Sequence, residues 1–275
     1  MKKILLSLLT ILFLQQACFA ALKLSPMVLE LDANNAKNGY ITTSLTVQGD
    51  ANETVRFKVY PEFFEITDEA KMNVIPKSNS AHSLIPHAVI VPNEFTLQKG
   101  QTQKIRLTFT NLKKLPDGES RMVIFLEDVA AKEVNLPSGR KNVATQLVVK
   151  TRVGVPVYID KGNYTKSGSF DELKVEKNND EKKLMYKMRL SSLGNSKVRY
   201  GGKGQIIKGK ELIDEFPITA SVIQSRGIAN VTNKLPSDKL EENEEYTLRV
   251  SLNYKDSAGK NKNLKKETKF NTEKL

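Results

Sequence analysis

Residues 246–254 read Tyr-Thr-Leu-Arg-Val-Ser-Leu-Asn-Tyr, and apolar or aromatic side chains occupy every second position of this stretch. Because successive side chains of a β-strand point to opposite faces of a sheet, a period of two predicts a strand with one buried face. The same alternation recurs in residues 55–60 and 104–109. It therefore indicates β-sheets along the chain rather than one isolated strand.

Short glycine-containing turn sequences separate the alternating runs, and no stretch longer than about ten residues keeps a helical period. Many short strands with regular turns predict an all-β fold of two immunoglobulin-like β-sandwich domains in tandem. The turn sequences are Asn38-Gly39, Lys99-Gly100, Asp117-Gly118, Ser138-Gly139, Gly201-Gly202 and Ala258-Gly259.

The first twenty residues are typical of a secretory signal peptide. Lys2 and Lys3 precede an apolar run from residue 4 to residue 14, and small residues follow at Cys18 and Ala20. This order predicts cleavage after Ala20. The run is shorter than the roughly 20 residues that a membrane span needs, and no later segment is long enough, so we expect no transmembrane segment in the mature chain. A retained N-terminal anchor and lipidation of Cys18 are the alternatives.

The expected mature chain divides into two domains of unequal charge. An apolar run ends near residue 160 and a turn follows, which predicts domains at residues 21–160 and 161–275. The first domain carries 17 basic and 15 acidic residues, and the second carries 24 and 16. A solvated strand face or turn, or contact with an acidic partner or an anionic surface, explains this excess of positive charge. The basic stretches hold few aromatic residues on which a base can stack, so nucleic acid is not expected as a partner.

The residue inventory argues against an enzyme. The chain has one cysteine and two histidines, and no sequence motif for a serine nucleophile or a phosphate-binding glycine loop occurs. His82 and His87 lie five positions apart in a polar connection, which does not match the spacing of helical metal motifs. We therefore expect no catalytic residue, no metal ligand and no cofactor.

Tyr246 follows the acidic stretch 241–245 at the start of a late strand. This arrangement is typical of a tyrosine corner, in which the ring packs into the sandwich and the hydroxyl hydrogen-bonds to the upstream loop. It predicts packing rather than a functional site.

Two spaced segments of the first expected domain resemble a known family. Residues 89–107 read Val-Ile-Val-Pro-Asn-Glu-Phe-Thr-Leu-Gln-Lys-Gly-Gln-Thr-Gln-Lys-Ile-Arg-Leu, and residues 115–121 read Leu-Pro-Asp-Gly-Glu-Ser-Arg. With the signal peptide and two sandwiches, they resemble the periplasmic pilus assembly chaperones of the chaperone–usher pathway, the PapD-like family. The resemblance is rich in motifs across residues 22–160 and weaker across 161–275. It implies a periplasmic protein whose partners are a fibre subunit and an outer-membrane usher.

The resemblance also implies a role for residues 144–159, the last strand of the first expected domain. In the family this strand lends alternate aliphatic side chains to a pilus subunit that lacks its own final strand, which is a form of β-strand addition. An ordinary core strand is the alternative interpretation. The implied donor residues are Leu147, Val149, Val153 and Val155.

The family further holds the terminal carboxylate of the subunit with an Arg on the opening strand and a Lys on the last strand, in the cleft between the domains. This chain departs from that pattern, because residues 27–28 and 155–156 are uncharged. Lys150 and Arg152 are the nearest basic residues and are the substitutes that the sequence offers. A solvated strand face is the alternative for both.

These observations predict a periplasmic chaperone that binds and stabilises fibre subunits by donor-strand complementation and delivers them to an usher. The alternative is a secreted structural or adhesive protein with tandem immunoglobulin-like domains and no client. Residues 130–142, before the donor strand, are expected to form a loop of modest length.

Overall fold

The computed structural model describes residues 22–36, 38–50, 54–130, 132–136, 145–178 and 183–272, with the backbone alone for residues 132–136 and 145–149. The expected signal peptide and Cys18 lie outside the described residues. Strands joined by turns dominate, as the alternation predicts, and the helical elements described are short 3-10 turns. They are Ala33–Asn35, Ile85–His87 and Leu112–Lys114.

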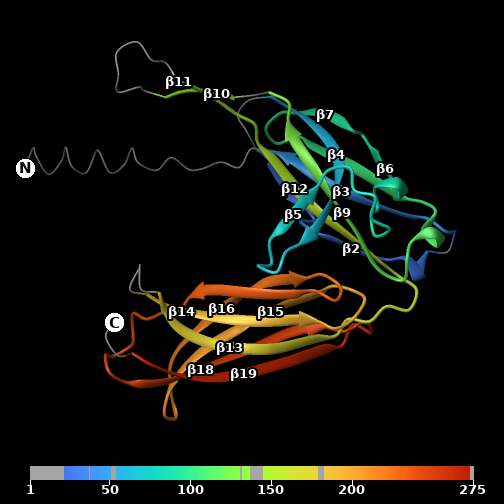
Figure 1. Ribbon diagram of the computed structural model, residues 1–275. Coiled ribbons are helices and arrows are strands. Elements are labelled where there is room, and N and C mark those ends of the chain that lie inside the picture. The colour runs from blue at the N-terminus through green and yellow to red at the C-terminus, as the bar shows by residue number, and fades with distance from the viewer. Residues whose placement is uncertain are drawn as a thin grey trace, which may run out of the picture.

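Two sheets pack face to face in the first half of the chain (Figure 1). One has the order β1 (Leu22–Ser25), β3 (Ile41–Gly49), β8 (Thr102–Phe109), β6 (Ala88–Val91). The other has the order β2 (Leu29–Asp32), β12 (Arg152–Lys161), β9 (Gly118–Asp128), β4 (Val55–Ile66), β5 (Met72–Ile75), with β7 (Glu94–Leu97) also paired to β4.

The core of this first sandwich consists of alternate residues from both sheets. Leu45, Ile105 and Leu107 come from one sheet, Ile124 and Val157 come from the other, and all five are fully buried. Each buried aliphatic side chain contributes about 1.5–3 kcal/mol relative to its exposed state. The predicted alternation of residues 55–60 and 104–109 is confirmed by this packing.

The opening strand changes sheets within a few residues. β1 pairs antiparallel with β3, and after Pro26 the chain crosses to the second sheet, where β2 runs parallel to β12. This crossing closes one side of the sandwich. It also carries β2 to the end of the domain that faces the second domain (Figure 1).

The second half of the chain forms another pair of sheets. One contains β13 (Gly168–Asn178), β14 (Lys183–Ser192) and β17 (Ile228–Lys234). The other has the order β16 (Glu211–Ile223), β15 (Val198–Lys208), β18 (Glu245–Lys255), β19 (Asn261–Asn271). Their shared core is separate from that of the first sandwich, so the chain has the expected two-domain all-β fold.

The tyrosine corner is confirmed in the second domain. Tyr246 is the second residue of β18 and has 2% of its surface exposed, and its hydroxyl accepts a hydrogen bond of 3.0 Å from the backbone N–H of Glu241. The ring stacks on Phe270 at a centroid distance of 5.8 Å. The contact ties the loop before β18 to the core.

Candidate functional site

The edge of β12 is only partly covered by neighbouring strands. β9 pairs with β12 over its whole length, from Arg152 to Lys161. On the other side β2 pairs only with Val157–Asp160. Among the described residues no strand pairs with that side of residues 152–156, so their outer backbone groups form a free β-edge. A free edge is a template for pairing with another chain.

The hairpin that carries this edge extends past the sheet. β10 (Lys132–Leu136) continues β9, β11 (Thr145–Val149) continues β12, and the two form a separate ladder from Lys132↔Val149 to Leu136↔Thr145 (Figure 1). Part of the stretch expected as a loop is therefore a strand, because the two arms of the hairpin go on pairing beyond the sandwich. The unpaired side of β11 follows on from that of β12.

The predicted donor residues fall on both sides of the boundary between this hairpin and the core. Leu147 and Val149 lie on β11, where only the backbone is described. Val153 is half-buried, whereas Val155 is fully buried with Val157 in the core of its own domain. The expectation that Val155 is offered to a partner is therefore corrected: removing it from the core would cost its packing there.

Lys150 and Arg152 lie at the hairpin end of β12, far along the strand from Asp160. Arg152 lies eight positions before Asp160 on the same strand, which is roughly 26 Å at the rise of a β-strand. Its guanidinium stacks 4.2 Å from the ring centroid of Phe125, and Nη1 lies 3.8 Å from Oε2 of Glu62. Lys150 is exposed. Both stand at the hairpin end of the strand, and their role as substitutes for the family's basic pair stays a prediction.

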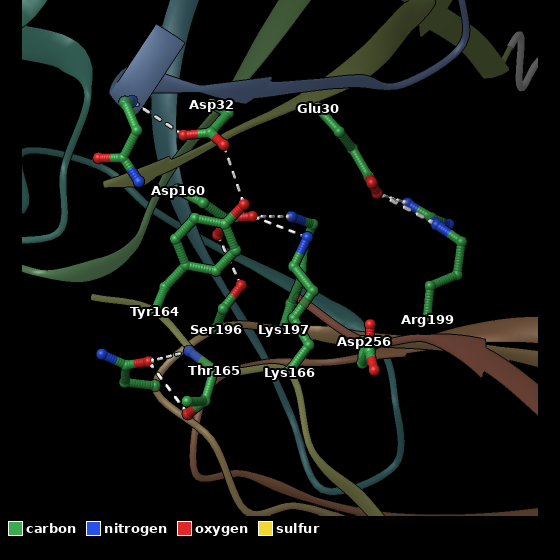
Figure 2. A network of polar contacts seen from close by, with 12 residues as sticks. Glu30, Asp32, Asp160, Tyr164, Thr165, Lys166, Ser196, Lys197, Arg199 and Asp256 are labelled. Carbon is green, nitrogen blue, oxygen red and sulfur yellow. Dashed lines mark hydrogen bonds and ion pairs between the residues drawn. The ribbon is translucent and has the colours of Figure 1, made fainter. Parts of the chain in front are cut away.

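The cations of the cleft come instead from the linker and the second domain (Figure 2). Arg199 of β15 donates from Nη2 to Oε1 of Glu30 on β2, at 3.0 Å. Nζ of Lys166 lies 2.8 Å from Oδ2 of Asp160 at the end of β12, and the Ser196 hydroxyl donates to Oδ1 of the same carboxylate at 2.6 Å. These contacts join β2 and β12 of the first domain to the second domain.

Lys197 is the most buried cation of this network. Its side chain is 2% exposed, and Nζ lies 3.6 Å from Oδ2 of Asp160 and 4.5 Å from the ring centroid of Tyr158. The ammonium makes no hydrogen bond within the described structure. Burial lowers the pKa of Lys197, and the charge of Asp160 opposes that shift.

The segment between the domains is pinned by hydrogen bonds to both. The Tyr164 hydroxyl donates to Oδ2 of Asp32 at 3.0 Å, and burial together with this bond raises the pKa of Tyr164 to about 12. Oδ1 of Asn195 accepts the backbone N–H of Thr165 at 2.7 Å. Gly194 makes this approach possible, because a Cβ there would lie 2.0 Å from the carbonyl oxygen of Thr165.

The turn between β4 and β5 makes a second contact between the domains. The backbone N–H of Ile66 donates to Oε1 of Gln224 at 3.0 Å, and the backbone N–H of Asn230 donates to the carbonyl oxygen of Asp68. Ala70 packs against the core of the second domain, and Val222 packs against an apolar cluster on the outer face of the first domain's sheet. The domains are thus joined at two places.

In the described ranges, no three or more His, Cys, Asp or Glu side chains are grouped so that they would hold a metal ion. No helix in the same ranges is both long and apolar enough to cross a bilayer. His82 and His87 each contact a backbone carbonyl oxygen through Nδ1, at 2.7 Å and 3.1 Å respectively.

Among known proteins, the chain matches solved structures but no family model. No protein-family model and no curated protein matches the chain. The chain is similar to solved fimbrial chaperones. The class 5 fimbriae chaperone CfaA matches with 16% identity and a TM-score of 0.45, over 90% of this chain and 98% of that chain.

Two further structures match to a similar extent. The CsuC–CsuE chaperone–tip adhesion subunit complex of the archaic Csu pili of Acinetobacter baumannii has 14% identity and a TM-score of 0.47, over 90% of this chain and 98% of that chain. The YadV chaperone has 9% identity and a TM-score of 0.48, over 90% of this chain and 100% of that chain.

Sequence reasoning missed the charged residues of the cleft. Lys166, Lys197 and Arg199 are spread over 34 positions of a lysine-rich domain, and their partners Glu30 and Asp160 belong to the other domain. The only signal in the sequence was the excess of basic residues after residue 160. Nothing in that excess distinguishes a cleft cation from a cation on a solvated strand face.

Proposed function

We propose that this protein is a periplasmic chaperone that binds a surface-fibre subunit by β-strand addition at the free edge of residues 145–156. The observation that carries the proposal is that edge: among the residues that the structure describes, no strand pairs with one side of residues 152–156 of β12, and β11 continues β12 beyond the sandwich. Such an edge gives main-chain hydrogen bonds to an incoming strand, while alternate side chains supply specificity.

The energetics favour a partner that lacks a strand of its own. A subunit with an open groove exposes apolar surface, and each aliphatic side chain placed in that groove contributes about 1.5–3 kcal/mol. Leu147, Val149 and Val153 are the donors that we propose. Together they would offset part of the conformational entropy that an incomplete subunit loses on ordering.

Release would then follow from exchange of the donated edge for a better-fitting strand. This route needs no cofactor and no nucleotide, because one set of main-chain hydrogen bonds replaces another. Delivery to an outer-membrane usher, and a leader peptide that directs the chain to the periplasm, are parts of the same proposal that come from the sequence resemblance.

Co-expression with a candidate fibre subunit tests the proposal. The probe is a reading frame that encodes an immunoglobulin-like domain without its last strand. Solved structures similar to this chain include a chaperone–tip adhesin complex and a pilin–chaperone complex, so a fibre subunit is the first partner to test. We expect a one-to-one complex on purification.

A matched pair of variants locates the contact. The double variant Leu147→Asp, Val149→Asp should lose the subunit and keep the melting temperature of the free protein. Leu212→Asp places one aspartate at an exposed apolar position of β16, 52% exposed, and should keep the complex. Retention of the subunit by the double variant would contradict the proposal and favour a tandem-domain protein without a client at this edge.

A further inference from the structure

Arg152 lies at the junction between the first sandwich and the hairpin that extends beyond it. It is the first residue of β12 in register with β9, where it stands opposite Glu127. The ladder of the hairpin begins at the pair of Lys132 and Val149. Four residues separate Glu127 from Lys132 on one arm, and two separate Val149 from Arg152 on the other. Such an unequal count is a β-bulge, which bends the strand that carries it.

The guanidinium of Arg152 points away from the free edge of β12. Its Cζ lies 4.2 Å from the ring centroid of Phe125 on β9, and Nη1 lies 3.8 Å from Oε2 of Glu62 on β4. In the sheet order β12, β9, β4, both of these strands lie on the side of β12 opposite to its free edge. The side chain therefore crosses β9, reaches β4 and leaves the backbone of the free edge accessible.

The ring of Phe125 is available for this contact because its cross-strand partner has no side chain. That partner is Gly154, where a Cβ would lie 2.9 Å from Cγ2 of Val123 and 3.0 Å from Cε1 of Phe125. Arg152 and Gly154 share one face of β12, because alternate residues of a strand point to the same side. The ring thus covers the strand at Gly154, and the guanidinium of Arg152 stacks on the ring.

Two carboxylates flank this stacked guanidinium. The side chain of Glu62 is 22% exposed, and its buried Oε2 accepts no hydrogen bond from the described residues, so Arg152 offsets a largely desolvated charge. Glu127 accepts a hydrogen bond of 2.5 Å from the Tyr60 hydroxyl. A guanidinium held on an aromatic face beside carboxylates is a stronger contact than an isolated exposed ion pair.

We propose that Arg152 is a positioning residue of the free edge, which fastens the start of β12 to β9 and β4 and so presents residues 152–156 to a partner strand. The inference rests on the proposed function, because a partner that adds a strand there needs a preformed edge. In the described part of the chain, β9 is the one strand that pairs with residues 152–156. A contact that reaches β4 gives this stretch a second support, and an edge that is already ordered loses less entropy on binding.

Hydrogen exchange of the free, full-length protein tests the support. Arg152→Met removes the charge and the planar group but keeps an unbranched side chain. It should speed the exchange of the protected amides of residues 152–155 on the order of tenfold, and leave residues 157–160 of the same strand unchanged. Arg152→Lys keeps the charge without the planar group and should recover only part of the protection. An equal rise in both stretches would show a general loss of stability and would contradict a positioning role.

Two further variants separate the contact from a general effect of charge. Gly154→Ala displaces the Phe125 ring and changes no charge, so it should also speed the exchange of the amides near Arg152. Arg249→Met is the matched control, because Arg249 pairs across strands with Glu267 at 2.7 Å on a sheet of the second domain. This control should leave the exchange of both stretches of β12 unchanged.

The same variants are then measured for binding of the fibre subunit used in the co-expression test. Arg152→Met should raise the dissociation constant on the order of tenfold, and Arg249→Met should leave it unchanged. Faster exchange without weaker binding would overturn the proposal. Weaker binding with unchanged exchange would assign Arg152 to direct contact with the partner, and would overturn it as well. If the parent protein binds no subunit, the proposed function fails, and the exchange measurement still decides whether Arg152 supports the strand.

Discussion

Val153 and Val155 stand two positions apart on the same face of β12, yet Val155 is fully buried and Val153 is half-buried. The strand therefore leaves the core of its domain between these residues. The residues of β12 after Val155 pack in the sandwich. The residues before Val153 lead into the hairpin that extends beyond the sandwich. This boundary decides which side chains of the strand are available to contact a partner protein.

Alanine substitutions at these positions should differ in their effect on stability. Val155→Ala should lower the free energy of unfolding by about 2–3 kcal/mol, because it removes buried methyl groups and leaves a cavity. Val153→Ala should lower the free energy of unfolding by less than about 1 kcal/mol, because the Val153 side chain is only half-buried. Urea unfolding of both variants measures the difference. Equal losses would contradict the boundary that we place between the two residues.

The buried ion pair of Glu119 and Arg121 should be essential to the stability of the first domain. Nη1 of Arg121 lies 2.9 Å from Oε1 of Glu119, and Nε donates to the carbonyl oxygen of Phe64 at 2.8 Å. Glu119 is 0% exposed. Arg121→Met should cost about 3–5 kcal/mol in the free energy of unfolding, since it leaves a buried carboxylate without its cation.

An exposed ion pair provides the control for that measurement. Lys269 and Glu245 have side chains 71% and 59% exposed. Lys269→Met should change the free energy of unfolding by less than about 1 kcal/mol. A similar loss in Lys269→Met and Arg121→Met would show that burial of the Glu119 carboxylate is not the cause.

The tyrosine corner should contribute to the stability of the second domain through the hydroxyl group of Tyr246. Tyr246→Phe keeps the stacked ring but removes the acceptor of the Glu241 backbone N–H. We expect a loss of about 0.5–1.5 kcal/mol in the free energy of unfolding, the usual net value of one such hydrogen bond. Thermal unfolding monitored by circular dichroism measures it, and an unchanged melting temperature would contradict the role of the hydroxyl.

Acid should weaken the contact between the domains. Burial disfavours the charged form of Glu30, but the cations Lys197, Arg199 and Lys166 outweigh it, and its pKa lies below the ordinary value of 4.5. A carboxyl group whose pKa is lowered by folding stabilises the folded state above the unfolded pKa, and this contribution is lost as the pH falls through the folded pKa.

Glu30→Gln isolates this effect. The variant should be less stable than the parent protein at neutral pH, and the two should converge as the pH falls below 4.5. Urea unfolding at a series of pH values measures the difference. A constant difference down to the lowest pH would show that Glu30 acts by packing and not by its charge.

The fold was predictable because its strands are short and half-buried. Alternation in residues 104–109 and 246–254 reports directly which side chains face a core, and the structure buries those side chains. The change of sheets after Pro26 was not predictable in the same way. Both pieces of the opening strand keep a period of two, so the sequence pattern does not reveal that they pair with different sheets.

The candidate site was predictable only in part. Alternation and the family resemblance single out residues 144–159, but alternation does not tell a strand that leaves the core from one that stays in it. For that reason the sequence predicts Val155 as a donor, although the structure buries it. The cleft depends on contacts such as Arg199 with Glu30, which join positions far apart in the sequence. Local patterns carry no information on such pairs.

The most direct test of the central claim is hydrogen exchange of the purified complex between this protein and a fibre subunit. The backbone amides of residues 145–155 should exchange more slowly in the complex than in the free protein, because their open edge would be hydrogen-bonded to the subunit. The edge of β16 serves as an internal reference and should be unchanged. A stable complex in which residues 145–155 exchange as fast as in the free protein would contradict the account.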